Sequence, residues 1–344
     1  MAQSGQPRLA DQVFADPLGT FQQGFGYNVS ADGEWLAVAY RLDNSRNIHE
    51  GSVYIYRRTE TGFVLFQILR ADSIQSLLLG TIDLELKGDL CIVSSTSDPV
   101  PNQIVTGAVY VFRFDGAAWR WEARLEPNDA QLPLGNAFGI SLGIADSNSI
   151  LVGAFSDSVP TPLPGVPSSR PRFTQRGAIY AFTKGPSGWT QTQKIKTHHP
   201  MASEGFDAEW TRCGLEIAIS GDTAIIGNRQ RMPLLLFVGG LFHANTLRRD
   251  SQGIWHESGQ IIHLGGHYRE EFGYSVAIEG DLMAIGAPVE AQNVSWVRPG
   301  YVYVYRRVAG RWTLETTLIA SDATVTVSPG DVTSDRFGES VSID

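Results

Sequence analysis

The chain has 344 residues, of which 42% are hydrophobic, and its formal net charge at pH 7 is −9. A negatively charged chain repels phosphate backbones, so this charge argues against nucleic-acid binding. No stretch approaches the roughly 18 uninterrupted apolar residues that a membrane-spanning helix needs. Two cysteines, Cys91 and Cys213, are too few for a disulfide scaffold, and each lies in an apolar run.

The first 24 residues form a lead of different character from the rest. Their opening, MAQSGQPRLADQ, lacks the basic and then apolar pattern of a signal peptide, so the protein is not secreted or its signal is missing from this sequence. We expect residues 1–24 to hold at most one short strand, within DQVFA, that helps to close a larger sheet arrangement.

From residue 25 onward a unit of constant design repeats. Each unit begins with a short alternating segment that ends in a tight turn. These segments are FGYNVSADG (25–33), GTIDLELKGD (80–89), FGISLGIAD (138–146), CGLEIAISGD (213–222), FGYSVAIEGD (272–281) and FGESVSID (337–344). A repeat of this length is typical of propellers and solenoids.

Three further strands complete each unit. A second apolar run follows the turn, as in WLAVAY and LMAIGAP, and a fourth run carries an aromatic residue near its start, as in WTLETTL. The third run begins at glycine: GSVYIYRR (51–58), GAVYVFRF (107–114), GAIYAFTK (177–184) and GYVYVYRR (300–307). Residues 272, 274, 276 and 278 are bulky while 273, 275 and 277 are small, so one sheet can pack its bulky face on its neighbour's small face.

Phe272-Gly273, then Gly-Ala-Pro at 286–288, then GYVYVY (300–305), resemble the FG-GAP repeat of integrin α-subunit head propellers and their bacterial and fungal relatives. The resemblance covers roughly residues 25–344 and is weaker in the second and fourth units. It implies an all-β propeller of four-stranded blades, seven in the family. This chain contains five full repeats, starting near 25, 80, 138, 213 and 272, and the first strand of a sixth near 337.

The last strand lacks its hairpin partner within the sequence. Unpaired strand edges are normally avoided. We therefore expect a piece of a longer chain, or an open ring completed by another copy, with self-association through the unpaired terminal strand.

Many members of the family carry calcium loops of the form D-x-D-x-D-G between the first two strands. Here the corresponding turns, such as EGDL and KGDL, are too short to supply the six to eight oxygen ligands that calcium takes. We expect no metal and no other cofactor, although the resemblance itself implies calcium.

One column of residues is polar in every unit and lies on the strand expected nearest the axis. Two of its members are acids, a pair that could serve acid–base chemistry in a hydrolase or lyase. No base, nucleophile or orienting partner accompanies them, so we favour a hydrogen-bonded, hydrated ring without a catalytic role. The column consists of Asn28, Asp83, Ser141, Glu216, Ser275 and Ser340.

The variable loops carry the residues most typical of recognition. Exposed tryptophan and arginine are common in protein-binding hot spots and in platforms that stack on sugars. The candidate ligand-binding residues, each from a long connection, are Arg170, Arg172, Trp210, Arg212, Trp296 and Arg298.

We interpret the chain as a propeller that binds a protein or a glycan through loops on one face and does not catalyse a reaction. The resemblance to integrins carries this interpretation and implies an extracellular or cell-surface location. A soluble, lectin-like sugar-binding propeller is the first alternative, and it suits a cytoplasmic or truncated chain without a signal peptide. A hydrolase or lyase that uses Asp83 and Glu216 is the second.

Overall fold

In the computed structural model, residues 14, 24–41, 51–70, 83–95, 107–129, 137–161, 172–175, 177–197, 213–228, 242–263, 271–288, 300–322, 325–328, 331–334 and 336–343 are described. All regular elements among them are strands, and within these ranges no helix is long and apolar enough to cross a membrane.

Five antiparallel sheets of four strands follow one another along the chain. Sheet 1 has β1 (Phe25–Asp32), β2 (Trp35–Tyr40), β3 (Ser52–Thr59) and β4 (Gly62–Leu69). Sheet 2 has β5 (Leu84–Lys87), β6 (Leu90–Ser95), β7 (Ala108–Phe114) and β8 (Trp119–Leu125). Sheet 3 has β9 (Phe138–Asp146), β10 (Ser149–Ala154), β13 (Ala178–Gly185) and β14 (Gly188–Ile195).

Sheets 4 and 5 continue the series. Sheet 4 has β15 (Cys213–Ser220), β16 (Thr223–Asn228), β17 (Phe242–Arg249) and β18 (Trp255–His263). Sheet 5 has β19 (Ser275–Glu279), β20 (Leu282–Ala287), β21 (Tyr301–Val308) and β22 (Arg311–Leu318). Two additional hairpins are β11 (Ser158–Thr161) with β12 (Arg172–Gln175), and β23 (Val325–Ser328) with β24 (Asp331–Ser334).

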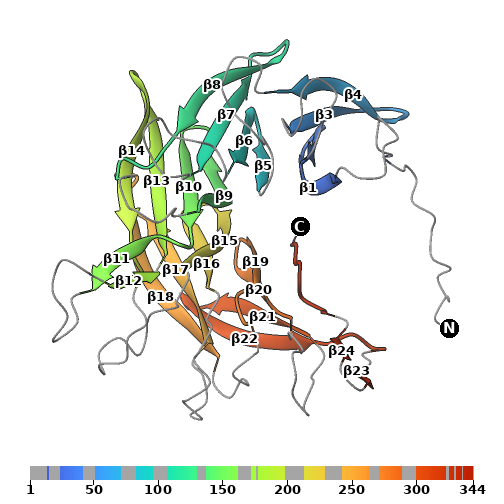
Figure 1. Cartoon of the computed structure of the whole chain (residues 1–344), viewed down its shortest axis with the longest axis vertical. Helices are drawn as coiled ribbons and strands as arrows, with labels where there is room; N and C mark the ends of the chain where they lie inside the picture. Colours follow the sequence, from blue (N-terminus) through green and yellow to red (C-terminus); the bar gives the residue numbers. More distant parts are fainter. Residues whose placement is uncertain are drawn as a thin grey trace.

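The sheets stand side by side in an arc, and Figure 1 shows β1, β5, β9, β15 and β19 along its centre. The arc is open between sheet 1 and the C-terminal segment. This is the β-propeller arrangement that the repeat predicts, with the first strand of each unit innermost. Five full repeats are confirmed by the five four-stranded sheets.

The core consists of layers between neighbouring sheets, as the bulky and small faces predict. One layer joins Ile225 and Ile261 of sheet 4 to Phe272, Val276 and Ile278 of the fifth unit. Each sheet therefore turns its bulky face toward the sheet before it in the chain. A sheet of this design cannot bury both faces by itself, which is the physical reason that the unit is repeated.

Glutamine side chains reinforce these layers at the outer strands. Gln67 of β4 accepts a hydrogen bond from Trp119 N (2.9 Å) and donates one to Trp119 O (2.8 Å) in the next sheet. Gln193 of β14 makes the same pair of bonds with Trp255 of sheet 4, at 2.8 and 3.0 Å. Each glutamine thus pairs with the main chain of a neighbouring sheet as another strand would.

The Phe-Gly segment that opens each unit is not always a strand. Residues 272–274 form a turn, and β19 starts only at Ser275, three residues later than predicted. Gly273 has φ +89° and lies against the main chain of Gly227 and Asn228, where a Cβ would be 3.1 Å from Asn228 N. Glycine is thus needed for a left-handed conformation and a close approach to the preceding sheet's main chain.

The predicted first strand of the sixth unit, 337–344, is wrong as a strand. Residues 337–340 form a turn and a bend, residues 341–343 have no regular secondary structure, and the Phe337–Gly338 segment lies against sheet 5, since Ser275 Oγ donates to Gly338 O (2.8 Å). No second strand pairs with it among the described residues, so no ladder stabilises the strand conformation. Of the lead 1–24, only Phe14 and Gly24 are described, and the short strand expected there lies outside the described residues.

Candidate functional site

Four members of the predicted polar column, Asn28, Asp83, Ser141 and Ser275, form hydrogen bonds with a neighbouring unit, whereas Ser340 lies in a bend and not on a strand. Asn28 Nδ2 donates to Asp83 Oδ1 at 2.9 Å, between units 1 and 2. Asp83 Oδ2 accepts from Leu142 N at 2.7 Å, between units 2 and 3. Ser141 Oγ donates to Gly214 O at 2.9 Å, between units 3 and 4. Together with the bond from Ser275 to Gly338, these contacts connect units 1 to 4 in series and unit 5 to the segment after it.

Glu85, two residues beyond Asp83, belongs to the same cluster and was not predicted. Its Oε2 accepts from Ile144 N at 2.8 Å, one step further along the strand pair that Asp83 joins. The signal for it was available, because residues two apart on a strand share a face. Ser30, two residues beyond Asn28, makes the corresponding contact between units 1 and 2: its Oγ accepts a hydrogen bond from Leu86 N at 3.0 Å.

Burial shifts the titration of all three axial acids upward. It raises the pKa of Asp83 to about 6, although hydrogen bonds from Leu84, Leu142 and Asn28 act in the opposite direction. Burial and the charge of Asp83 raise the pKa of Glu85 to about 8. Burial, followed by the charges of Asp83 and Glu85, raises the pKa of Glu216 to about 8. Glu216 therefore carries a proton over much of the neutral range.

These acids differ in how far their oxygens are engaged. Both oxygens of Asp83 accept hydrogen bonds, Oδ1 from Asn28 and Leu84 and Oδ2 from Leu142. Such a carboxylate acts as a structural tie between sheets. Glu216 interacts with Asp83 and Glu85 through their charges. Within the described ranges, no three His, Cys, Asp or Glu side chains lie close enough together to hold a metal ion.

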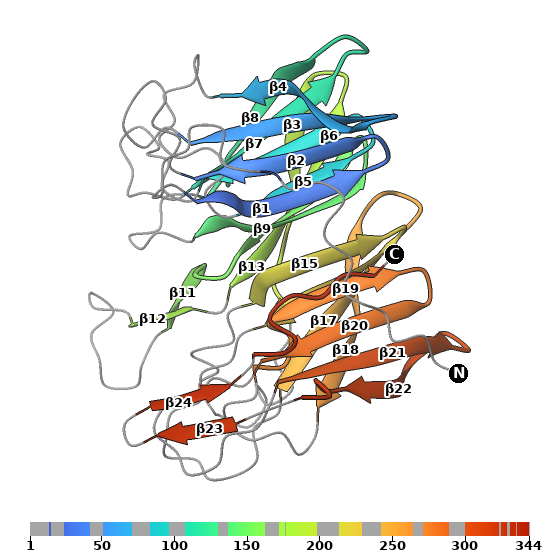
Figure 2. The ribbon, with the colours of Figure 1, turned by 90° about the vertical axis from the view of Figure 1, so that its right-hand side faces the viewer.

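The long connections all lie at one end of the strands. The first two strands of each sheet are joined by a tight turn, at 33–34, 88–89, 147–148, 221–222 and 280–281. We call the end of the array that carries these turns the turn face. Because strand direction alternates in an antiparallel sheet, the connections between strands 2 and 3, and those between sheets, must lie at the opposite end of the strands. We call this end the loop face. Both additional hairpins, β11–β12 and β23–β24, belong to such connections and extend on the same side in Figure 2.

The predicted ligand-binding residues belong to these connections. Arg172 begins β12, where it pairs with Thr161 of β11. The side chain of Arg172 lies outside the described residues, as do Arg170, Trp210, Arg212, Trp296 and Arg298. Their role in binding stays a prediction.

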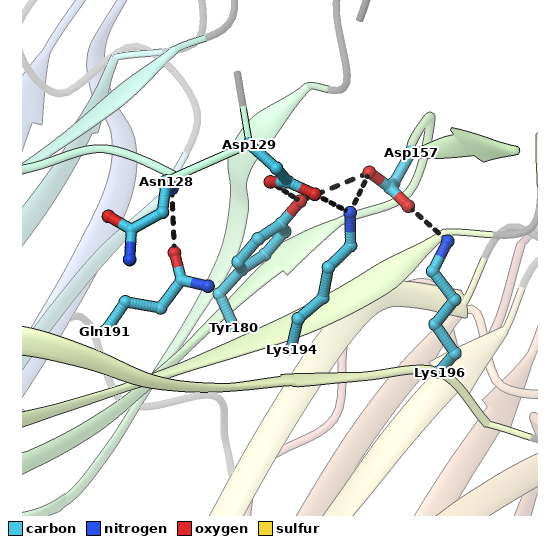
Figure 3. Close-up of polar contacts among 7 residues, drawn as sticks. All are labelled: Asn128, Asp129, Asp157, Tyr180, Gln191, Lys194 and Lys196. Carbon is cyan, nitrogen blue, oxygen red and sulfur yellow. Dashed lines mark hydrogen bonds and ion pairs between the residues drawn. The ribbon is translucent and has the colours of Figure 1, made fainter. Parts of the chain in front are cut away.

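A polar network around the buried Asp157 lies at the base of the β11–β12 hairpin, on the loop face (Figure 3). Asp157, directly before β11, has a fully buried side chain that accepts from Lys194 Nζ (2.9 Å) and Lys196 Nζ (2.7 Å). Tyr180 donates its hydroxyl toward Asp157 Oδ1 (3.2 Å) and Asp129 Oδ1 (3.0 Å). Lys194 also pairs with Asp129, which follows the last strand of sheet 2.

The main chain of Asp157 closes the hairpin. Gly177 N donates to Asp157 O at 3.0 Å, and Asp157 N donates to Ala154 O at 3.0 Å. The network thus fixes the point where the hairpin leaves sheet 3. It also fixes the connection from sheet 2, since Asn128 N donates to Gln191 Oε1 at 2.9 Å.

The charges of this network stabilise one another. Burial acts to lower the pKa of Lys194, but its bonds to Asp129 and Asp157 outweigh burial and raise it. Burial acts to raise the pKa of Asp129, yet the bonded Lys194 ammonium lowers it overall. Burial and the two carboxylates raise the pKa of Tyr180 far above its usual range, so its hydroxyl remains a donor. The group is suited to holding a structure and not to proton transfer.

Sequence reasoning missed this network because its members come from four separate segments. One signal was present: an acid three residues after the second strand recurs at Asp43, Asp98, Asp157 and Glu290. Tyrosine recurs in the third strand as Tyr54, Tyr110, Tyr180 and Tyr303, and Tyr110 accepts from Arg124 Nε at 3.2 Å, the counterpart of the pairing of Tyr180 with Lys194.

Residues 255–305 match the model of the FG-GAP repeat family. This part of the chain is similar to the FG-GAP repeat. The matched range runs from β18 to the third strand of sheet 5, where the sequence motif is most complete. No curated protein sequence matches the chain.

Among solved structures, the chain is similar to the WD40 domain of Neurospora crassa Pan2, with a TM-score of 0.47 and 10% identity over 86% of this chain and 65% of that one. It is also similar to the β-propeller domain of the Trilobed protease from Pyrococcus furiosus, with a TM-score of 0.45 and 10% identity over 89% and 75%. The Hadza microbial sialidase Hz136 gives a TM-score of 0.41 and 11% identity over 86% and 58%. At such scores and identities these neighbours carry no information about activity.

Proposed function

We propose that this FG-GAP repeat propeller is a non-catalytic recognition protein that binds a protein or a glycan through its loop face. The observation that carries the proposal is the placement of both additional hairpins, β11–β12 and β23–β24, among the connections of this one face. Added structure on one face of a repeated scaffold is typical of binding surfaces, because loops vary freely while the scaffold fixes their positions.

The anchoring of the β11–β12 hairpin supports the same proposal. A surface that is fixed before binding loses less conformational entropy when its ligand binds. The buried carboxylate of Asp157 holds the base of this hairpin with two lysines and a tyrosine. An extracellular or cell-surface location accords with this function and is part of the proposal.

A glycan array and a proteome-wide binding screen with the intact protein would test the proposal and separate the two ligand classes. Arg172→Ala alters the hairpin, and Arg120→Ala is the matched control, since Arg120 pairs with Asp115 near the turn face at 2.9 Å. We expect Arg172→Ala to weaken binding at least about tenfold, as for a hot-spot residue, and Arg120→Ala to leave it unchanged. A ligand whose affinity responds only to Arg120→Ala would contradict the proposal.

A second candidate function rests on Glu216. A carboxyl group whose pKa is raised to about 8, beside two other acids, has the titration expected of a general acid in a hydrolase. If a hydrolytic or lyase activity is found, Glu216→Gln should abolish it while leaving the protein folded. Asp83 would serve less well as its partner because both of its oxygens are engaged.

We also propose that folding needs no calcium. The turns at 88–89 and 280–281 each supply a single aspartate, and Arg113 and Arg307 pair with these carboxylates at 2.8 and 2.7 Å. A metal bound only to the folded state would stabilise it by mass action. We therefore expect the Tm to be the same in excess chelator and in millimolar calcium, measured by differential scanning calorimetry.

A further inference from the structure

The fourth strand of each sheet forms the outer edge of the array. Within the described residues, the outer strands β4, β8, β14, β18 and β22 each pair with the third strand of their own sheet and with no other strand. Figure 1 shows β4 on the outside of sheet 1, with β1 toward the centre. A strand at the edge of a sheet is a template for pairing with another chain, unless its sequence or shape prevents this.

A β-bulge lies at the same place in all five outer strands, where one residue is left without a partner on the third strand. The bulged residues of sheets 1 to 5 are Phe66, Glu122, Thr192, Ser258 and Glu315. In sheets 2 to 5 this residue is polar and bonds to the third strand. Glu315, for example, pairs with Arg306 at 2.6 Å, and Ser258 Oγ donates to Thr246 Oγ1 at 3.1 Å. A polar side chain held in this way keeps the edge hydrophilic.

Sheet 1 departs from this design. Its bulged residue Phe66 is 37% exposed, and its ring packs against that of Trp35, with the ring centroids 5.0 Å apart. The two residues before it, Val64 and Leu65, are 53% and 44% exposed. Successive side chains of a strand point to opposite faces, so these three residues present apolar surface on both sides of the β4 edge.

Charge distinguishes β4 from the other outer strands as well. Its sequence GFVLFQIL contains no charged residue, whereas each of the other four contains at least one. These charged residues are Arg120, Glu122 and Arg124 on β8, Lys194 on β14, Glu257 on β18, and Arg311 and Glu315 on β22. Charged residues on an edge strand hinder pairing with another chain. Of these five strands, β4 alone has no such protection.

The partner that best matches β4 is the β4 strand of a second copy. If two β4 strands lie antiparallel with Leu65 opposite Leu65, then Val64 of each copy lies opposite Phe66 of the other. At the ends of the strand the same register places Glu60, which is exposed, opposite Arg70 of the other copy. Opposite charges that face each other across two strands stabilise the pair, and no like charges meet in this register.

We propose that two copies of this chain associate through antiparallel pairing of their β4 strands, with Leu65 on the two-fold axis. The bulge shortens the regular hydrogen-bonded ladder, so the apolar contacts of residues 64–66 and the two pairs of Glu60 with Arg70 determine the register. Because both copies use the same surface, association stops at a dimer.

The geometry of this dimer has a consequence for binding. Strand β4 follows a turn at the turn face and runs toward the loop face, so antiparallel pairing directs the loop faces of the two copies in opposite directions. A dimer of this kind can bridge two ligands. That consequence rests on the proposed function of the loop face, whereas the association itself does not.

The position of Leu65 on the axis allows a test by charge. Sedimentation velocity of the full chain over a wide concentration range would measure association. Leu65→Lys and Leu65→Glu each place like charges opposite each other, so each variant alone should raise the apparent dissociation constant at least about tenfold. An equimolar mixture of the two variants places opposite charges on the axis and should restore the dimer.

Leu314→Lys is the matched control. Leu314 directly precedes the bulge of β22 and pairs with Tyr305, as Leu65 pairs with Tyr56, and it is 48% exposed. The substitution adds the same charge to an equally exposed outer strand, so association should stay as in the unmodified chain. Circular dichroism would verify that all three variants fold.

Three results would overturn the proposal. A monomer at every concentration of the unmodified chain would leave an extended segment of a different protein as the partner of β4. Equal effects of Leu65→Lys and Leu314→Lys would assign the change to overall charge and not to β4. A mixture of Leu65→Lys and Leu65→Glu that stays monomeric would exclude the two-fold register centred on Leu65.

Discussion

The turn face and the loop face are built on opposite principles. At the turn face one contact recurs in every sheet: a residue of the first turn accepts a main-chain bond from the end of the third strand, as in Arg58 N to Glu34 O (2.7 Å) and Arg307 N to Asp281 O (2.8 Å). At the loop face the network around Asp157 occurs in this developed form only in sheet 3, as far as the described residues extend. The repeated contacts thus belong to the scaffold, and the contacts found in one sheet alone indicate where that sheet differs from the others in function.

Replacing Asp157 should lower the free energy of unfolding more than any other substitution considered below. Asp157→Asn removes the buried charge that Lys194 and Lys196 share, and leaves these two partly exposed cations without that partner. Breaking a buried ion pair by removing one partner costs roughly 3–5 kcal/mol, and the partial exposure of both lysines places this case near 2–4 kcal/mol. Urea denaturation would measure it, with Asp281→Asn at the turn face as the control. If the two variants lost similar amounts of unfolding free energy, the two faces would not differ in the way proposed.

Gly153→Ala should come next, because the second strand has no room for a methyl group. A Cβ at Gly153 would clash with Gly214 O and Ser141 Oγ of the axial contact between units 3 and 4. Overpacking of this kind costs about 1–3 kcal/mol. Gly185→Ala is the matched control, since its nearest atom is Gly188 O at 4.0 Å. If both substitutions proved neutral in chemical denaturation, close packing between sheets would not limit stability.

The sequence predicts the scaffold well because its contacts are periodic. The alternation of Phe272 and Gly273, and the polar position of Ser275, recur in unit after unit, so comparison of the copies reveals faces, strands and the axial column. The Asp157 network depends on residues from the connections 126–129 and 155–157 and from two strands, which only the fold brings together. The turn at 272–274 was missed because a first strand was extrapolated through a glycine whose φ is positive.

From the raised pKa values of the axial acids we predict a smaller, pH-dependent change in the stability of the protein, which arises at the inner strands. Folding raises the pKa of Glu85 and Glu216 to about 8, above the value of about 4.3 of an exposed glutamate. The folded state therefore binds more protons between these values, and stability falls as the pH rises from about 4.3 to about 8. We expect a lower Tm at pH 8.5 than at pH 5.5, and a shallower fall in Glu216→Gln.

Glu279→Gln provides the control for that measurement. Glu279 ends β19 with an exposed side chain at the turn face, and Ser220 Oγ lies 3.4 Å from its Oε2. Glu279→Gln removes one carboxyl group, as Glu216→Gln does, but at an exposed position away from the axis. A pH profile flattened equally by both variants would assign the effect to overall charge and not to the half-buried axial acids.

The smallest effect is expected from the ion pairs that make the turn face so regular. Arg57 Nε lies 2.9 Å from Glu34 Oε2, but both side chains are nearly half exposed, at 47% and 48%. Water and salt screen such a pair, and exposed pairs contribute about 0.2–1 kcal/mol in double-mutant cycles. Arg57 also lies over the ring of Trp35 at 5.3 Å, so Arg57→Ala should cost more than Glu34→Gln. A cycle of these two variants in low and high salt would isolate the pair. A coupling above about 2 kcal/mol that persists in high salt would mean that this repeated contact holds the sheet together, whereas we assign that role to the layers between sheets.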